Sequence, residues 1–300
     1  MGQLLVMKKT INPTTIYHVA RCFEKASKMK QQHGRPRQYS LALILTIACI
    51  QNLYTLSFRE ALEFSEFVLK DIPCLSTFHY RVKTLDPEII QQFIGFLGLE
   101  LQKQFHEAGK KIKLFIIDGT GFSYHDVYPL QYLRGTEVRK VQSHVRALAL
   151  VASTGRERFF IGAQPGRAYA SETKMAEKLL PHFSFKQHLP FLGDKGFDSI
   201  YLLHSIKQAG ALPCIKMKEG RHMNILDPER KLSKKNECIH GGKRTLIEGL
   251  FGNTKQKTTS HIKVFIQSIA KTFALIRLAL YDIYLLSKML KGYLLFEQPL

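Results

Sequence analysis

Acidic residues are scarce in this chain of 300 residues. Asp and Glu number 24 against 44 Lys and Arg, which leaves a formal net charge of +20 and a pI near 9.7. The excess of positive charge runs along the whole chain and does not form a single tail. Such a surface favours a polyanion as partner, because spread positive charge attracts the phosphates of a nucleic acid. A ribosome-like protein, or a merely soluble basic one, is the alternative.

Cysteine is also sparse. The five cysteines are odd in number, widely spaced and without a CxxC pair. This usage is typical of reduced thiols in a cytoplasm and gives no disulfide framework. Cys238 and His240 lack two further ligands at the spacing that structural zinc requires. We expect no secretory signal peptide, because the first charges follow a very short apolar run.

Long hydrophobic runs are missing too. The longest uncharged stretch extends from Tyr39 to Phe58, but its apolar part is confined to 41–50. Apolar stretches of about 10–14 residues usually indicate a buried helix and not a membrane span. The helical pattern at 262–296 carries charged residues, which makes a membrane span unfavourable there as well. We therefore expect no membrane partner.

Short helical patterns fill the N-terminal third, after a basic and lightly patterned segment at 1–34. They lie at 41–50, 56–64, 75–83 and 88–105. Ser57 followed by Glu60 predicts a capping box, and Ser76 or Thr77 is expected to cap the next helix. Short helices with a basic one among them are typical of DNA-reading helix-turn-helix modules. We expect a helical DNA-binding domain at 35–108, the alternative being helices that only pack against the rest of the protein.

From residue 109 onwards strand and helix patterns alternate. Strands are predicted at 112–117, 145–152, 158–163, 190–193 and 211–217, and helices at 171–180, 199–209, 244–257 and 262–296. The polar, aperiodic stretch at 218–243 predicts a loop or insertion. This order indicates an α/β catalytic domain at 109–296.

Two of the predicted strands end at an aspartate followed closely by glycine. Asp118 precedes Gly119, and Asp194 precedes Gly196. In open sheets, binding and active sites commonly lie at the ends of strands. The ends of neighbouring strands can therefore bring the two carboxylates together. The alternative is that each aspartate merely caps a turn.

A third acidic residue lies on a predicted helix with basic neighbours. Arg244, Glu248 and Lys255 fall within about 40° of one another at 3.6 residues per turn. Two aspartates and a glutamate make an oxygen-rich site for hard divalent cations. A pair of such cations could support an in-line displacement at phosphorus. Arg244 and Lys255 would hold the DNA backbone beside it. An ordinary Arg–Glu pair on the helix surface is the alternative.

These motifs resemble a known family. The segments Ile117–Thr120, Gly193–Ser199 and Arg244-x3-Glu248-x6-Lys255 are similar to the DDE signature of insertion-sequence transposases. The segment from Gly34 to Leu85 also resembles their helical N-terminal domain. The resemblance implies an α/β fold with an RNase H-like mixed sheet flanked by helices, preceded by a small all-helical domain.

The resemblance also implies residue roles and partners. Asp118, Asp194 and Glu248 would be the catalytic, metal-binding residues, and Arg244 and Lys255 would contact DNA. The cofactor would be two Mg²⁺ ions, with Mn²⁺ as a substitute. The partners would be double-stranded DNA, as terminal inverted repeats and target, and further copies of the chain in a synaptic dimer or larger assembly at the cytoplasmic nucleoid.

One position departs from the family pattern. The tyrosine of the motif would fall at position 241, where the sequence has Gly241. This branch either functions without the tyrosine or is a decayed copy. A catalytically inactive or domesticated DNA-binding protein is therefore one alternative to a transposase. An RNase H-like nuclease, which would cut DNA but never transfer a strand, is the other.

Overall fold

A computed structural model describes residues 11–27, 38–131, 138–185, 188–218 and 227–296, with backbone alone at 126–131, 138–142 and 290–296. The described strands form one six-stranded mixed sheet. They are β1 (Leu114–Gln131), β2 (Val138–Ser153), β3 (Arg158–Arg167), β4 (Pro190–Gly193), β5 (Leu212–Ile215) and β6 (His261–Ile262). Their order is β3-β2-β1-β4-β5, with β6 paired to β1. β1 to β3 are antiparallel neighbours, whereas β4 and β5 run parallel to β1.

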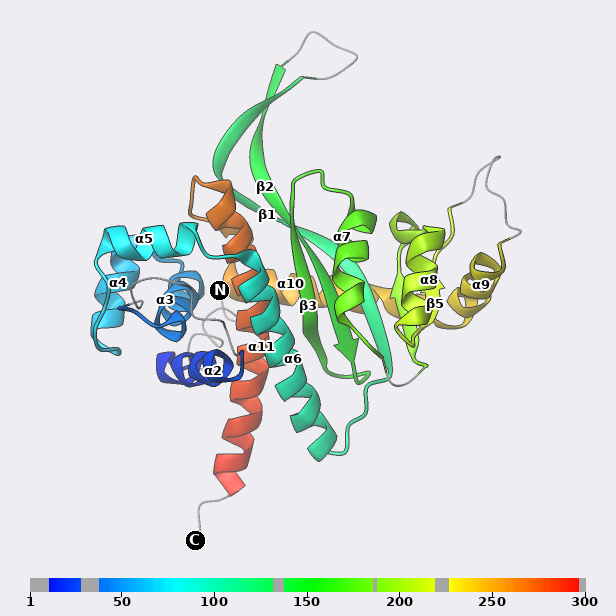
Figure 1. The fold of residues 1–300 in the computed structure, drawn as a ribbon, viewed down its shortest axis with the longest axis horizontal. Helices are drawn as coiled ribbons and strands as arrows, with labels where there is room; N and C mark the ends of the chain where they lie inside the picture. Colours follow the sequence, from blue (N-terminus) through cyan, green and yellow to red (C-terminus); the bar gives the residue numbers. More distant parts are fainter. Residues whose placement is uncertain (1–10, 28–37, 132–137, 186–187, 219–226, 297–300) are drawn as a thin grey trace.

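Helices flank this sheet on both faces (Figure 1). One face is covered by α6 (Pro87–Glu107), α10 (Thr245–Thr258) and α11 (Gln267–Phe296). The other carries α7 (Glu172–Leu179) and α8 (Ile200–Gln208), and α9 (Pro228–His240) packs beside β5. Short 3₁₀ turns are η1 (Leu180–His182), η2 (Lys195–Phe197) and η3 (Gly241–Arg244). A mixed sheet flanked by helices is consistent with the RNase H-like fold that the sequence predicted.

The N-terminal helices pack on the outer side of α6 and α11 (Figure 1). They are α2 (Pro13–Ala26), α3 (Leu41–Tyr54), α4 (Phe58–Glu66) and α5 (Leu75–Lys83). Their buried side chains belong to the same hydrophobic cluster as those of the sheet. Buried Arg277 of α11 adds a polar link, because its Nε donates to Asn52 Oδ1 of α3 at 3.2 Å. The separate DNA-binding domain at 35–108 stays a prediction.

Helix α3 is the buried helix that the sequence predicted. Every residue from Leu41 to Leu53 is buried, because the helix is apolar on all sides and has no face to offer to water. Among the described helices none is long and apolar enough to cross a membrane alone. The pair α3 and α4 meets the requirement by length and composition only, and it is bent by 112°.

The predicted helix caps are confirmed in one case and corrected in another. Ser57 and Glu60 form a reciprocal capping box at α4, with bonds of 3.2 and 2.6 Å. Helix α5 begins at Leu75, so that its N-cap is Cys74, two or three residues before the expected Ser76 or Thr77. Hydrogen bonds from those two hydroxyls lower the pKa of the exposed Cys74 thiol to about 7.

Two helices lie where the sequence predicted none. α2 occupies part of the basic segment at 1–34, capped by the side chain of Asn12. α9 occupies part of the expected loop or insertion at 218–243, and that expectation was wrong for 228–240. Its anchor is polar: Ser233 Oγ accepts from Ile215 N at 2.8 Å and donates to Ile215 O at 3.1 Å. A helix held by hydrogen bonds needs no apolar stripe, so hydrophobic periodicity cannot reveal it.

Strand β1 is longer than the sequence predicted. The apolar run stops at Asp118, but the backbone pairs with β2 through Gly119, Thr120 and Gly121 and on to Gln131. The expectation that Asp118 ends its strand was therefore wrong. Glycine is common in turns, but here it occupies a strand where another side chain approaches the backbone closely.

Buried Asp282 of α11 gives the first prediction. Its Oδ1 accepts from Phe160 N at 3.1 Å, beside the bulge in the β2–β3 pairing, and within the described residues Oδ2 has no hydrogen-bond partner. Burial raises the pKa of Asp282 well above its usual value. Protonated Asp282 contributes fully to the free energy of unfolding at pH values below the unfolded pKa of about 4. This contribution is lost as the pH rises through the folded pKa. Asp282→Asn should remove this loss, which can reach about 1.4 kcal/mol per pH unit.

Urea unfolding at several pH values tests this prediction. The free energy of unfolding of Asp282→Asn should exceed that of the wild type by an amount that grows with pH. Asp86→Asn is the control, because exposed Asp86 caps α6 and asparagine is an equally good cap. Parallel pH profiles for the wild type and Asp282→Asn would contradict the prediction.

Candidate functional site

Asp118 and Asp194 are neighbours across two parallel strands. Ile116 of β1 pairs with Leu192 of β4. Asp118 comes two residues after Ile116, and Asp194 comes two residues after Leu192. Adjacent strands lie about 4.8 Å apart, so this register places the two carboxylates side by side. The Asp118 Oδ1 accepts from Gly119 N at 2.8 Å. The Asp194 Oδ1 accepts from Gly196 N at 2.7 Å, which makes Asp194 the cap of η2.

The surroundings of Asp118 disfavour its negative charge. Its side chain is 17% exposed. Burial is the main cause that raises the pKa of Asp118 to about 6. The negative charges of Asp194 and Glu172 act in the same direction, whereas the Gly119 N–H and Arg244 lower the pKa. The site therefore holds more negative charge than its arginine neutralises.

Arg244 connects the third predicted acid to this pair. Its Nη1 lies 3.7 Å from Asp118 Oδ2, and its Nη2 lies 3.4 Å from Glu248 Oε1. Glu248 belongs to the first turn of α10, and its side chain is 58% exposed. The fold thus brings Asp118, Asp194, Arg244 and Glu248 to one place, with a guanidinium between the strand and the helix.

The other motif positions are Lys255 and Gly241, and within the described residues no hydrogen bond or ion pair joins Lys255 to the acids. Lys255 is half-buried, with its Nζ 5.6 Å from the centre of the Phe122 ring on β1, and burial lowers its pKa. Lys255 thus contacts an aromatic face in this arrangement. Gly241 opens the η3 turn that leads into α10, and a Cβ there would meet the Glu237 carboxylate at 2.5 Å.

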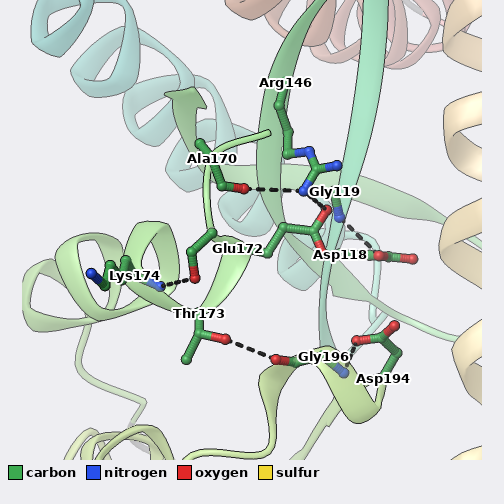
Figure 2. Close-up of polar contacts among 10 residues, drawn as sticks. Asp118, Gly119, Arg146, Ala170, Glu172, Thr173, Lys174, Asp194 and Gly196 are labelled. Carbon is green, nitrogen blue, oxygen red and sulfur yellow. Dashed lines mark hydrogen bonds and ion pairs between the residues drawn. The ribbon is translucent and has the colours of Figure 1, made fainter. Parts of the chain in front are cut away.

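Sequence reasoning missed Glu172, the first residue of α7. Figure 2 shows its carboxylate beside Gly119, on the strand that carries Asp118. Arg146 Nη1 of β2 lies 3.2 Å from Glu172 Oε1. Burial, and after it the charge of Asp194, raises the pKa of Glu172, while Arg146 lowers it. A glutamate in a first helical turn is common, so nothing in the local sequence distinguished it.

The donor atoms of this group are carboxylate oxygens, the type that hard divalent cations prefer. In the described part of the chain no three His, Cys, Asp or Glu side chains converge tightly enough to enclose a metal ion as the side chains stand. However, Asp118 is half-buried beside two like charges, and a cation would relieve their repulsion. Carboxylates with room for waters are the ligands that Mg²⁺ prefers. Arg244, which bridges Asp118 and Glu248, would have to move aside.

Comparisons with known proteins give a limited result. No family model matches the chain. An uncharacterised protein of Aquifex aeolicus is 28% identical over 264 residues, which cover 86% of this chain and 81% of that protein. Among solved structures, a piggyBac transposase synaptic complex with hairpin DNA aligns with 97% of this chain and 76% of its own, at a TM-score of 0.41 and 11% identity.

Proposed function

We propose that this protein is the DNA transposase of an insertion sequence, which cleaves DNA at the element ends and joins the freed 3′-hydroxyl to target DNA. One observation carries the proposal. Asp118, Asp194 and the Arg244–Glu248 pair are far apart in the sequence, and the fold gathers them at the junction of β1, β4 and α10. The DDE resemblance assigns the three acids to catalysis and assigns Arg244, together with Lys255, to DNA contact.

Each of these residues has a role in the reaction. Asp118, Asp194 and Glu248 would hold Mg²⁺, which when bound activates an attacking oxygen and stabilises a leaving one. Arg244 carries a forked guanidinium that suits a phosphate as well as a carboxylate. When Arg244 turns to a DNA phosphate, it leaves Asp118 and Glu248 without their ion-pair partner. DNA arrival and cation binding would therefore favour each other. Water would attack in the cleavage step and the 3′-hydroxyl in the joining step.

A groove further along β1 and β2 from the acids is suited to the DNA backbone. It has a volume of about 460 Å³ and is lined by Tyr124, Ser143, His144, Arg167, Ala168, Tyr169, Ala170 and Gln267. Exposed Arg167 and half-buried Lys271 are close enough for the charge of Arg167, after burial, to lower the pKa of Lys271. Two cations that repel each other favour an anion between them. The Ala170 carbonyl accepts from Arg146 at 3.1 Å, which links the groove to the Glu172 side of the acids.

This placement predicts a change in salt dependence. Replacing Arg167 and Lys271 together by alanine should lower the slope of log K against log salt concentration by about 2, because each phosphate contact contributes about 0.9. Fluorescence anisotropy with duplex DNA over a range of KCl concentrations measures the slope. Arg156→Ala is the matched control, since exposed Arg156 precedes β3 and Arg167 ends it. An unchanged slope in the double variant would place the DNA elsewhere.

A strand-transfer assay tests the function itself. Oligonucleotides that carry the inverted repeats flanking the gene are incubated with the protein, target DNA and Mg²⁺. We expect cleavage at the repeat ends and joined products. Cleavage without joining would instead establish a nuclease. Salt-sensitive binding without cleavage in Mg²⁺ or Mn²⁺ would establish a non-catalytic DNA-binding protein. Sedimentation with the same DNA tests the synaptic dimer or larger assembly.

A further inference from the structure

A buried arginine fastens the chain just after α10 to the N-terminal helices. The Arg277 side chain of α11 is 2% exposed, and its Nη1 and Nη2 donate to the carbonyls of Thr259 and His261, each at 2.8 Å. Thr259 directly follows α10 and has a φ of 69°, which is strained for a β-branched residue. The third bond goes from Nε to Asn52 of α3. Arg277 thus holds the end of α10, and α3 holds Arg277.

The Arg277 guanidinium can form more hydrogen bonds than these contacts use. A guanidinium carries five N–H groups, and the described part of the chain engages three of them. Burial lowers the pKa of Arg277 to about 9, and no carboxylate of the described residues offsets this effect. The group still carries its charge at neutral pH. Because buried donors of a charged group are rarely left unpaired, the two remaining N–H groups need an acceptor.

A small cavity adjoins this guanidinium. Its volume is about 10 Å³, and its polar lining consists of Gln51, Asn52, Thr55, Lys263 and Arg277. Gln51 is 3% exposed, and within the described residues its Oε1 has no hydrogen-bond partner. Lys263 is already engaged, because its Nζ donates to the Thr55 carbonyl at 3.2 Å. The cavity therefore brings together a buried acceptor and a buried donor that both have hydrogen bonds still to form.

We infer that this cavity binds one water molecule, which bridges Gln51 of α3 to Arg277 of α11. A space of about 10–15 Å³ is enough for one water where two or more polar groups surround it. The water would accept an N–H of Arg277 and donate one hydrogen to Gln51 Oε1. Its second hydrogen would go to Asn52 Oδ1, which keeps a lone pair after it accepts from Arg277 Nε. The water thereby makes Gln51 part of the support of α10, the helix that carries Glu248 and Lys255.

The sign of a change in melting temperature tests the inference. Gln51→Met keeps the length of the side chain and its helix propensity but removes the acceptor. With a bound water, the substitution breaks a hydrogen bond in a buried network, and we expect the melting temperature to fall by about 2–4 °C. In a dry cavity it would remove an acceptor without a partner, and an equal or higher melting temperature would overturn the inference. Gln102→Met, on the exposed side of α6, is the control and should leave the melting temperature unchanged.

Hydrogen exchange tests the link to α10. In Gln51→Met, the backbone amides in the last turn of α10 should exchange faster than in the wild type, by about threefold or more. The amides of α7, on the opposite face of the sheet, should exchange at the wild-type rate. Equal rates for both proteins in the last turn of α10 would overturn the inference that a water supports this helix.

A crystal structure of the full chain, from crystals grown in sodium bromide, identifies the occupant of the cavity directly. Bromide scatters anomalously and therefore distinguishes an anion from a water. We expect electron density for one water within hydrogen-bond distance of Gln51 Oε1 and of the Arg277 guanidinium, without an anomalous signal. A cavity without density, or an anomalous peak in it, would overturn the inference.

Discussion

Asp118→Asn should lower the rate of Mg²⁺-dependent DNA cleavage by about a thousandfold or more. Asparagine keeps the shape of the side chain and can still accept from Gly119 N, but it removes the charge that would hold the cation. Metal-ion catalysis supplies several kcal/mol of transition-state stabilisation, and about 4 kcal/mol corresponds to a factor of a thousand. Single-turnover cleavage of DNA with the element ends measures the rate.

The same variant should still bind DNA, because Arg167, Lys271 and the other cations of the surface are unchanged. Anisotropy under the conditions of the cleavage assay separates binding from catalysis. Glu157→Gln is the control, since that carboxylate pairs with Lys110 at the turn between β2 and β3. Its cleavage rate should match that of the wild type. A cleavage rate for Asp118→Asn close to that of the wild type would remove Asp118 from the active site.

Two glycines of α6 should respond in opposite ways to alanine. In a helix interior the change normally stabilises by up to about 1 kcal/mol. At Gly95 the nearest atom to an added Cβ is the Ile161 carbonyl oxygen at 3.9 Å, an ordinary contact. At Gly98 an added Cβ would lie 2.8 Å from the Phe160 oxygen and 2.9 Å from the Ile161 Cα. These are backbone atoms of β3, which cannot move aside as a flexible side chain can.

We therefore expect Gly95→Ala to leave the free energy of unfolding equal or slightly higher. Gly98→Ala should lower it by about 1–3 kcal/mol through overpacking. Urea denaturation measures the free energy of unfolding of both variants. Because both substitutions are glycine to alanine in one helix, they change helix propensity equally, and the difference between them reports the packing against β3. Equal effects at both positions would show that α6 can shift away from β3 without cost.

The sequence predicted the α/β order because its buried strands are short apolar runs between turn residues. It also predicted the meeting of Asp118 and Asp194, because each follows an apolar run, and the observed register of β1 and β4 places them side by side. Ser57 and Glu60 predicted their capping box from a purely local pattern. The capping box survives in the fold because it depends only on residues a few positions apart.

Other features depend on contacts that no local pattern encodes. Gly119 and Gly121 suggested a turn, yet β1 continues because the long antiparallel pairing with β2 outweighs the turn preference of glycine. α9 is anchored by Ser233 on β5 and not by an apolar stripe. Glu172 comes close to β1 only because α7 passes over a strand position without a side chain. That approach is visible only in three dimensions.

Anomalous diffraction from crystals of the protein soaked in Mn²⁺ tests the central claim most directly. The claim is that Asp118 and Asp194 form a divalent-cation site at the junction of β1 and β4. We predict an anomalous peak within coordination distance of both carboxylates, with Arg244 moved away from Asp118. The absence of a peak at saturating Mn²⁺, with Arg244 still paired to Asp118 and Glu248, would contradict the claim.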